Sequence, residues 1–292
     1  MISIVTAYYN RKKLFVKTLE SIEKQIKNYP HNVEVIAVDD GSDENERLED
    51  LKLNFPFLKI IRLEKRNKWY TNSCIPYNIG FSEAKGEKII IQNPECLHYG
   101  NILKYTDEHL SSNIYLSFAC YSLDEEPTEN IDNYIENPQK IEKLIQENNE
   151  ANKLDGTNSW YNHSKIRPAG YHFCTAIMKE DLEDLGGFDE KYALGVAFDD
   201  DEFLFRIKLK KMKIQFVDQE LVLHQNHYNK KSQFNNQKLL SEKDQKKRTE
   251  LVIKNQQLFE SKTKLKKNWR ATKTFSNYIA KNLFYITSLF KK

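Results

Sequence analysis

Strand-like and helix-like segments alternate along the first ninety residues, and this order restricts the fold more than any other feature. Four short apolar runs are typical of strands: 2–8, 33–38, 58–63 and 88–91. Three stretches between them have helical spacing of apolar residues: 12–26, 44–53 and 75–84. Such alternation predicts a parallel sheet with helices on both faces. Two later runs, 171–178 and 214–224, also resemble strands.

Sheets of this kind bind their ligands beyond the carboxyl ends of the strands. Three polar segments follow predicted strands and would meet at that edge: 6–11, 39–42 and 92–98. The residues that bind and react are therefore expected in these segments.

The tetrapeptide Asp39-Asp40-Gly41-Ser42 ends the second predicted strand. Carboxylates at a strand end can accept hydrogen bonds from a nucleobase N–H or a ribose hydroxyl, and Gly41 permits a sharp turn. The same residue types also cap the helix that follows such a turn. The tetrapeptide alone favours neither interpretation.

Candidate metal ligands follow two of the predicted strands. Glu95 supplies a carboxylate after the fourth strand, with Asn93 two residues before it. Hard divalent cations prefer oxygen ligands, and such a cation neutralises a diphosphate leaving group. His224 and His227 end the 214–224 run, so one imidazole could reach the same metal. Taken singly, such residues more often form an Asn-Pro turn and surface histidines than a metal site.

Four consecutive acidic residues, Asp199 to Glu202, stand between Gly187-Phe188-Asp189-Glu190 and Arg206. A carboxylate held near an acceptor hydroxyl can act as a general base. Acidic residues are also favoured in the first turn of a helix by its dipole. Both interpretations can hold at once.

The order and spacing of these segments resemble family 2 glycosyltransferases of the GT-A fold. Residues 3–11 look like the opening strand and nucleotide loop of that family, and 38–42 like its uridine-binding turn. Residues 78–91 look like the segment before its Asp-x-Asp metal motif. Asp199, Asp200 and Arg206, after 187–190, look like its acceptor-side signatures. The resemblance covers about residues 2–228.

The resemblance implies an α/β fold of the GT-A (Rossmann-like) type, with a mixed sheet flanked by helices. It implies a nucleotide-binding half at about 1–110 and an acceptor-binding half at about 111–228. The expected enzyme moves a sugar, with UDP-hexose favoured, from a nucleotide-sugar donor to an acceptor hydroxyl. The reaction would be a single displacement with inversion, in which divalent Mn²⁺ or Mg²⁺ stabilises the departing diphosphate.

The same resemblance implies roles for individual residues. Asp200 would be the general base, with Asp199 as its neighbour. Glu95 would ligate the metal together with His227 or His224. The residues expected around the nucleotide are Thr6, Ala7, Tyr8, Asn10, Arg11, Asp39, Asp40 and Asn93.

Two departures from the family pattern bear on activity. The Asp-x-Asp motif reads Asn93-Pro94-Glu95 here, which removes one charge from the expected metal site. A catalytically inactive relative that binds sugar nucleotides or glycans is therefore the alternative function. Ile75-Pro76-Tyr77-Asn78 stands where many relatives have Ala-Arg-Asn, so an arginine contact would come from elsewhere. Arg167 and Lys165 are the candidates.

The segment 158–163 combines aromatic rings with amide and imidazole groups. Sugars stack their C–H faces on aromatic rings and need hydrogen-bond partners for their hydroxyls. Trp160 and His163 are therefore expected to contact a glycan or glycolipid acceptor or the donor sugar. Packing of Trp160 beneath its own loop is the other interpretation.

Charge divides the chain at about residue 228. Residues 229–292 carry 17 Lys/Arg and 4 Asp/Glu, a net of +13, so residues 1–228 carry −10 of the overall +3. This basic, mainly helical extension has apolar residues near one helical face: Phe275, Tyr278, Ile279, Leu283, Ile286, Leu289 and Phe290. Such a helix suits an anionic membrane surface, or it packs on residues 1–228, the body of the protein. On the first interpretation, truncation after Ser261 should spare activity.

Other features restrict the compartment and the partners. No signal peptide or membrane-spanning run is found, so a cytoplasmic protein, peripheral on the inner face of the membrane, is expected. The four cysteines are widely spaced and are expected to be reduced. The basic extension lacks a recognisable nucleic-acid motif, so no nucleic-acid partner is expected. Surface-polysaccharide or lipopolysaccharide assembly would fit these properties.

Overall fold

The computed structural model describes residues 1–29, 31–153, 156–227 and 241–272. The strands are β1 (Ile2–Tyr8), β2 (Val33–Asp39), β3 (Leu58–Arg62), β4 (Lys88–Gln92), β5 (Cys96–His98), β6 (Ile114–Ser122), β7 (Ser159–Asn162), β8 (Cys174–Met178) and β9 (Lys213–His224). The α-helices are α1 (Lys12–Ile26), α2 (Cys74–Glu83), α3 (Ile102–His109), α4 (Glu125–Glu129), α5 (Ile131–Ile135), α6 (Pro138–Glu147), α7 (Lys179–Leu185), α8 (Asp199–Leu209) and α9 (Glu242–Thr263). The short 3₁₀ helices are η1 (Glu44–Glu46), η2 (Glu49–Leu53), η3 (Lys65–Asn67) and η4 (Glu190–Leu194).

In the described part of the chain the strands form one sheet in the order β3-β2-β1-β4-β8-β6-β9-β5, with β7 paired to β6. β1 is parallel to both β2 and β4, and β2 is parallel to β3, as the alternation of segments predicts. β8 then runs antiparallel to both β4 and β6. The sheet is therefore mixed, as the GT-A resemblance implies. The predicted helix at 44–53 is two 3₁₀ helices instead.

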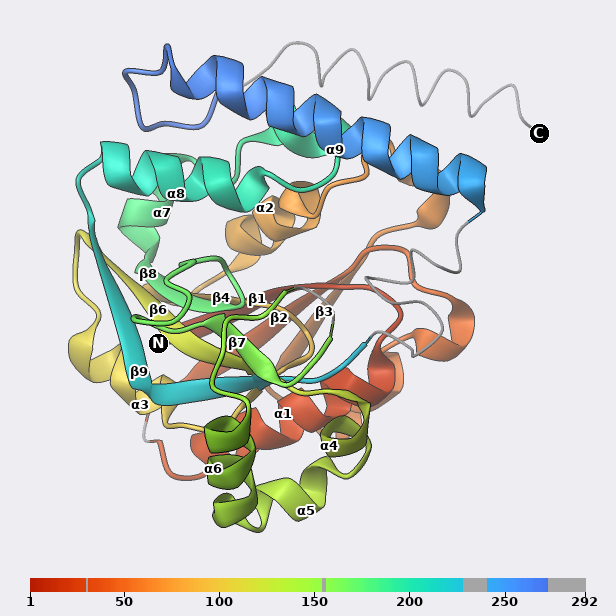
Figure 1. Cartoon of the computed structure of the whole chain (residues 1–292), viewed down its shortest axis with the longest axis vertical. Coiled ribbons are helices and arrows are strands. Elements are labelled where there is room, and N and C mark those ends of the chain that lie inside the picture. The colour runs from red at the N-terminus through yellow and green to blue at the C-terminus, as the bar shows by residue number, and fades with distance from the viewer. Residues whose placement is uncertain (30, 154–155, 228–240, 273–292) are drawn as a thin grey trace.

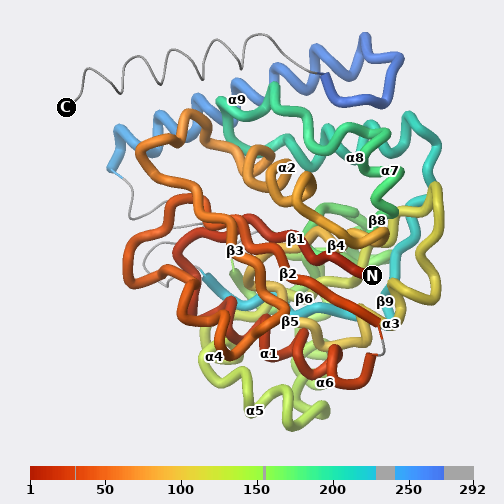
Figure 2. The backbone as a smooth tube through the Cα atoms, turned by 180° about the vertical axis from the view of Figure 1, so that it is seen from behind, coloured from red at the N-terminus to blue at the C-terminus, as the bar shows by residue number. Residues whose placement is uncertain are grey.

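Helices cover both faces of this sheet. Figure 1 shows α2, α7 and α8 above the sheet with α9 outside them, and α1 with α4 to α6 below; Figure 2 shows the same layers from behind. Successive residues of a strand point to opposite faces. Accordingly Ile4 packs in one core cluster with Phe15 and Leu19 of α1, whereas Val5 packs in a second cluster with Phe203 of α8.

Close packing of α2 on β1 depends on a glycine. A Cβ atom on Gly80 would lie 2.4 Å from Cγ1 of Val5, so a larger residue would push the helix off the sheet. The four cysteines are free and buried, which agrees with their expected role as small apolar residues. No helix among the described residues is long and apolar enough to cross a membrane.

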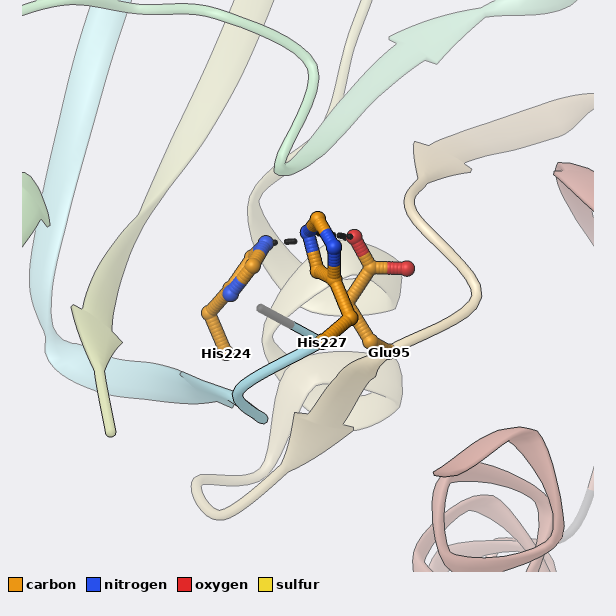
Figure 3. Close-up of side chains that lie close together, drawn as sticks. All are labelled: Glu95, His224 and His227. Carbon is orange, nitrogen blue, oxygen red and sulfur yellow. Dashed lines mark ion pairs between the residues drawn. The ribbon is translucent and has the colours of Figure 1, made fainter. Parts of the chain in front are cut away.

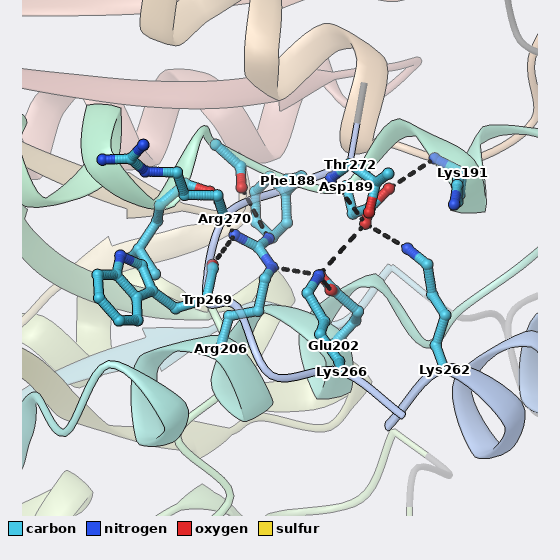
Figure 4. A network of polar contacts seen from close by, with 12 residues as sticks. Phe188, Asp189, Lys191, Glu202, Arg206, Lys262, Lys266, Trp269, Arg270 and Thr272 are labelled. Carbon is cyan, nitrogen blue, oxygen red and sulfur yellow. Dashed lines mark hydrogen bonds and ion pairs between the residues drawn. The ribbon is translucent and has the colours of Figure 1, made fainter. Parts of the chain in front are cut away.

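The described part of the basic extension packs against α7 and α8. Beyond α9, the backbone N–H of Ala271 donates to Leu185 O at 2.7 Å, and the indole of Trp269 donates to Asp184 at 2.8 Å. Figure 4 shows how lysines of this segment reach buried carboxylates. The apolar residues that suggest membrane binding, from Phe275 onward, lie outside the described residues.

Five charged residues form what we call the charged network: Asp189, Glu202, Arg206, Lys262 and Lys266 (Figure 4). Arg206, Glu202 and Asp189 are each at most 1% exposed. Arg206 pairs with Glu202 at 2.7 Å, and Lys266 pairs with the other oxygen of Glu202 at 2.8 Å. Lys262 pairs with Asp189. The extension thus supplies the cations that neutralise two buried acids of the body.

This pairing predicts a loss of stability on truncation after Ser261. Loss of Lys262 and Lys266 leaves Asp189 without its lysines, and an uncompensated buried charge destabilises a protein by about 3–5 kcal/mol. We expect the melting temperature to fall by several degrees, as measured by thermal denaturation. A chain that ends at Thr272 keeps every described contact and is the matched control. Equal melting temperatures for the two chains would contradict the structural role of these lysines.

Candidate active site

The three polar segments expected to bind ligand do lie at one edge of the sheet. β1 pairs with β2 so that Tyr8 faces Asp39, and β1 pairs with β4 so that Val5 faces Ile91. Because the three strands are parallel, the residues that follow them converge. The chain turns sharply there, with φ of 47° at Asn10 and 82° at Gly41.

The loop after β1 is tied to the turn after β2. The backbone N–H of Asn10 donates to Ser42 Oγ at 3.1 Å, and the Asn10 side chain exchanges hydrogen bonds with Asp43 at 2.8 and 2.9 Å. Thr6 and Tyr8 are buried, and the Tyr8 hydroxyl donates to Glu46 O at 2.7 Å. Thr6 and Tyr8 therefore shape this loop from below, whereas Ala7, Asn10 and Arg11 are partly exposed at its surface.

The two aspartates after β2 differ in environment. Asp39 is fully buried, accepts a hydrogen bond from the Ser42 N–H at 2.9 Å and pairs with Arg62 at 3.1 Å. Asp40 is partly exposed, and its two oxygens accept from the Tyr70 hydroxyl at 2.6 Å and from Lys68 at 2.5 Å. Asp39 therefore holds the turn, which leaves Asp40 as the better placed of the two to contact a ligand.

Glu95, His224 and His227 lie together although about 130 residues separate the acid from the histidines (Figure 3). β5 pairs with β9 so that Cys96 faces His224, which brings Glu95 beside the end of β9. Glu95 Oε1 lies 3.2 Å from His224 Nε2 and 3.4 Å from His227 Nε2. Its other oxygen pairs with Arg11 at 2.8 Å.

The electrostatics of this cluster suit a cation. Burial raises the pKa of Glu95, but Arg11 and the two imidazoles outweigh burial and hold that pKa well below its usual range. Burial and the charge of Arg11 lower the pKa of His227 to about 3. The cluster therefore offers an ionised carboxylate beside a neutral imidazole, which are the forms that ligate metals. Ligand atoms of all three side chains lie within 4.8 Å of one another.

Each of the four consecutive acids at the start of α8 has its own partner. Asp199 accepts from Asn72 Nδ2 at 2.9 Å, and Asp200 forms an ion pair with His172 Nδ1. Asp201 accepts from the Tyr171 hydroxyl at 2.8 Å, and Glu202 belongs to the charged network. Separate partners explain how four acids are tolerated in sequence. The Asp200 side chain is 31% exposed, so it can meet a substrate.

Asp199 and His172 each have a raised pKa. Burial and the neighbouring Asp200 raise the pKa of Asp199 to about 6. Burial lowers the pKa of His172, but Asp200 and Asp199 outweigh burial and raise that pKa above 6.5. Both shifts mean that the folded protein binds protons more tightly than the unfolded chain. Its free energy of unfolding should therefore fall as pH rises from the unfolded pKa values of these two groups through their raised folded values.

The substitution Asp199→Asn tests whether stability falls as pH rises. Between pH 4 and 6 the wild-type free energy of unfolding should decline, because folding opposes the ionisation of Asp199. The variant lacks that carboxyl group, so we expect a shallower decline in denaturant titrations at several pH values. Asp244→Asn, at the exposed start of α9, is the control. Parallel pH profiles for the wild type and Asp199→Asn would contradict the raised pKa.

Tyr77 stands between the two clusters. Its hydroxyl lies 2.9 Å from Gln92 O, to which it donates, and 3.2 Å from Asn93 Oδ1. Its ring centroid is 4.9 Å from that of His172, which pairs with Asp200. The sequence alone does not single out Asn72, Tyr77 or His172. Tyr77 and His172 are single polar residues in apolar segments, and Asn72 lies in a polar stretch between a predicted strand and a predicted helix.

Trp160 lies outside this site. It is 5% exposed, packs in a core cluster with Tyr121 and donates its indole N–H to Asn149 at 2.8 Å. Alternation along β7 places Tyr161, rather than Trp160, against His224, with ring centroids 4.7 Å apart. The ring faces of Trp160 are covered, so Trp160 is not part of the proposed site.

His163 and Arg167 lie beyond the end of β7 and pair with each other through their backbones. His163 stacks near Trp160, with ring centroids 4.6 Å apart, and approaches Asp218 at 3.8 Å. Arg167 donates to Tyr161 O and lies 5.9 Å from the centre of the Tyr171 ring. Since Tyr171 donates to Asp201, Arg167 is the one nearer to the acids of α8.

Solved structures share this fold. S. aureus TarS (residues 1–349, in complex with UDP) matches with a TM-score of 0.53 and 17% identity over 76% of this chain and 59% of TarS. GalNAc-T7, with UDP, GalNAc and Mn²⁺, matches with a TM-score of 0.52 and 18% identity over 77% of this chain and 43% of its own. The chain thus spans less than two thirds of either protein. At these identities the likeness concerns the fold, which is GT-A.

Sequence comparisons identify the family. No curated protein matches the chain. The family model described as glycosyl transferase family 2 matches residues 3–170, which is more than half of the chain and includes the ends of β1, β2 and β4. This protein therefore belongs to glycosyl transferase family 2 and has the GT-A fold.

Proposed function

We propose that this protein transfers a hexose from a uridine diphosphate sugar to an acceptor hydroxyl, by a single displacement with inversion. The observation that carries the proposal is the pair of clusters on either side of Tyr77: Glu95 with two imidazoles, and Asp200 with His172. The Glu95 cluster suits a diphosphate with its cation, and the Asp200–His172 pair suits a hydroxyl that must lose its proton.

Asp200 is the proposed general base. Its carboxylate accepts the proton of the acceptor hydroxyl while that oxygen forms a bond to the anomeric carbon. The bond between that carbon and the diphosphate oxygen breaks, and the diphosphate leaves with the electron pair. His172 pairs with Asp200 Oδ1 and so orients the carboxylate. Asn72 orients the neighbouring Asp199 in the same way.

Glu95, His224 and His227 would hold a divalent cation. When bound, such a cation stabilises the negative charge of the departing diphosphate. A set with two imidazoles favours Mn²⁺ over Mg²⁺, because Mg²⁺ strongly prefers oxygen ligands. Arg11, paired with Glu95 at 2.8 Å, carries a second positive charge to the same place. This charge can assist the departing diphosphate, but it does not replace the negative ligand charge missing at Asn93.

The nucleotide would lie along the carboxyl edge of β1, β2 and β4, with Asp40 rather than Asp39 reading the base. UDP in the complexes of TarS and GalNAc-T7 supports uridine as the nucleoside. The residues proposed to form this side of the site are Thr6, Ala7, Tyr8, Asn10, Arg11, Asp39, Asp40 and Asn93.

A screen of UDP-glucose, UDP-galactose, UDP-GlcNAc, UDP-GalNAc and GDP-mannose tests the proposal. With Mn²⁺ present, one UDP-sugar should raise the melting temperature, because a ligand that binds only the native state stabilises it. The same donor should release UDP in a coupled assay with glycan acceptors. Binding without any turnover would favour the alternative, a catalytically inactive relative that binds sugar nucleotides.

The acceptor is proposed to be a glycan or glycolipid, as in the assembly of a surface polysaccharide or lipopolysaccharide. Arg167 and His163 are the proposed contacts on this side. The basic extension would bring the enzyme to an anionic membrane from the cytoplasmic face. Liposome pelleting of the full chain, compared with a chain that ends at Thr272, measures this last point. Equal pelleting would contradict it.

A further inference from the structure

The turn that leads into α8 has a strained backbone. Ala197 and Phe198 both have left-handed conformations, with φ of 59° and 65°. Neither residue is glycine, so in each the Cβ atom crowds the backbone. Strain of this kind persists only where the surroundings enforce it. Asp199 and Asp200 follow directly, so whatever holds this turn also sets the direction of the proposed base.

Helix α9 supplies the contacts that hold the turn. Asn255 is fully buried, and its side-chain N–H groups donate to Ala197 O at 2.8 Å and to Tyr192 O at 3.1 Å. A Cβ atom on Gly195 would lie 2.1 Å from Asn255 Oδ1, so glycine is needed there for the helix to come this close. The fit between turn and helix is therefore tight on both sides.

Two further residues of α9, Leu251 and Phe259, contact the same turn. Leu251 O accepts a hydrogen bond from the Val196 N–H at 3.2 Å, and the ring of Phe259 lies 5.9 Å from that of Phe198. Leu251, Asn255 and Phe259 are four residues apart and so share one face of the helix. Figure 1 shows α9 on the side of α8 that faces away from the sheet.

Asn72 connects the turn that α9 holds to the proposed catalytic acids. Asn72 Nδ2 donates to Asp199 Oδ1 at 2.9 Å and lies 3.4 Å from Ala197 O, the same carbonyl that Asn255 binds. Ala197 O is thus shared by an amide of the body and an amide of α9. A shift of this carbonyl would move both the turn and the acids after it.

We propose that α9 positions the base of this enzyme, with Asn255 as the positioning residue that holds the strained 197–198 turn. The C-terminal extension is then part of the catalytic machinery rather than only an attachment segment. The inference rests on the proposed role of Asp200 as general base. It requires no contact between Asn255 and substrate.

Asn255→Ala should lower kcat at least tenfold and leave the donor KM and the affinity for UDP unchanged within twofold. The reason is that a misplacement of about 1 Å can slow a reaction on the order of a hundredfold. The donor is proposed to bind at the other half, so its binding should not change. Gln256→Ala, at the exposed neighbour on α9, is the matched control and should keep wild-type kcat.

A rescue separates positioning from general destabilisation. Glycine adopts positive φ readily, so Ala197→Gly relieves part of the strain that Asn255 opposes. The double variant Asn255→Ala/Ala197→Gly should therefore recover at least threefold in kcat over Asn255→Ala. Ile22→Val, which removes a buried methyl group below the sheet, should lower the melting temperature without lowering kcat. If Asn255→Ala does not fold, Phe259→Leu should still lower kcat at least threefold at constant KM.

The outcomes are distinguishable. An active wild type with unchanged kcat in Asn255→Ala and in Phe259→Leu overturns the role of α9 and leaves the proposed function intact. A fall in kcat that Ala197→Gly fails to rescue overturns the role of the strained turn. A wild type that binds UDP-sugar without transfer overturns the proposed function itself.

Discussion

Replacement of Asp200 with asparagine is expected to lower kcat for sugar transfer by roughly 10²- to 10⁴-fold, the usual contribution of a general base. Asparagine keeps the shape of the side chain, but its amide cannot accept the proton of the acceptor hydroxyl. The His172 ion pair is lost as well. Because the base acts in the transition state, KM for the donor should change little. Steady-state kinetics with the best UDP-sugar measure both constants.

Asp201→Asn is the matched control for this experiment. Asp201 is the next acid along α8, but it accepts a hydrogen bond from Tyr171, and an asparagine oxygen can accept the same bond. Its kcat should stay within a few fold of the wild type. Comparable losses in Asp200→Asn and Asp201→Asn would indicate that the charge of the whole acidic turn matters, and not one base.

The second large effect is expected at Glu95. Glu95→Gln removes the one carboxylate of the Glu95, His224 and His227 cluster and with it the ion pair between Glu95 and Arg11. We expect at least a tenfold loss of Mn²⁺ affinity, since the cation loses its charged ligand. Transfer should fall about a hundredfold or more, because the departing diphosphate then loses the stabilisation that the cation supplies. Calorimetric titration with Mn²⁺ and the UDP-release assay report these separately.

Glu147→Gln, at an exposed position that ends α6, controls for the loss of one negative charge. It should change neither the affinity for Mn²⁺ nor the rate. If Glu95→Gln bound Mn²⁺ as tightly as the wild type, the cation would have to bind elsewhere. The cluster would then serve only as a buried ion pair.

Much of the first half of the fold could be predicted from local patterns. The strand β2 is an apolar run that ends at Asp39-Asp40-Gly41, and α1 carries its apolar residues on one face. Each pattern can be recognised within a few residues of sequence. The later strands were harder. The antiparallel pairing of β8 with β4 and β6 joins segments far apart in sequence, and no local period encodes it.

The candidate site divides in the same way. Asp40 and Asp200 stand out in the sequence because acidic residues cluster there, and Glu95 stands out because it closely follows a predicted strand. His172 and Tyr77 do not, because each is a single residue in an apolar segment. Only the folded chain shows that His172 meets Asp200 and that Tyr77 joins the two clusters.

By itself the sequence determined the alternation of strands and helices, the edge of the sheet at which the polar segments meet, and the family. Tertiary structure decided the role of the C-terminal extension. In the sequence its charge of +13 suggests attachment to a surface. In the fold Lys262 neutralises buried Asp189, and Asn255 holds the turn before Asp199. The physical reason is that a charge or an amide acquires its role from the groups buried beside it, and these come from distant parts of the chain.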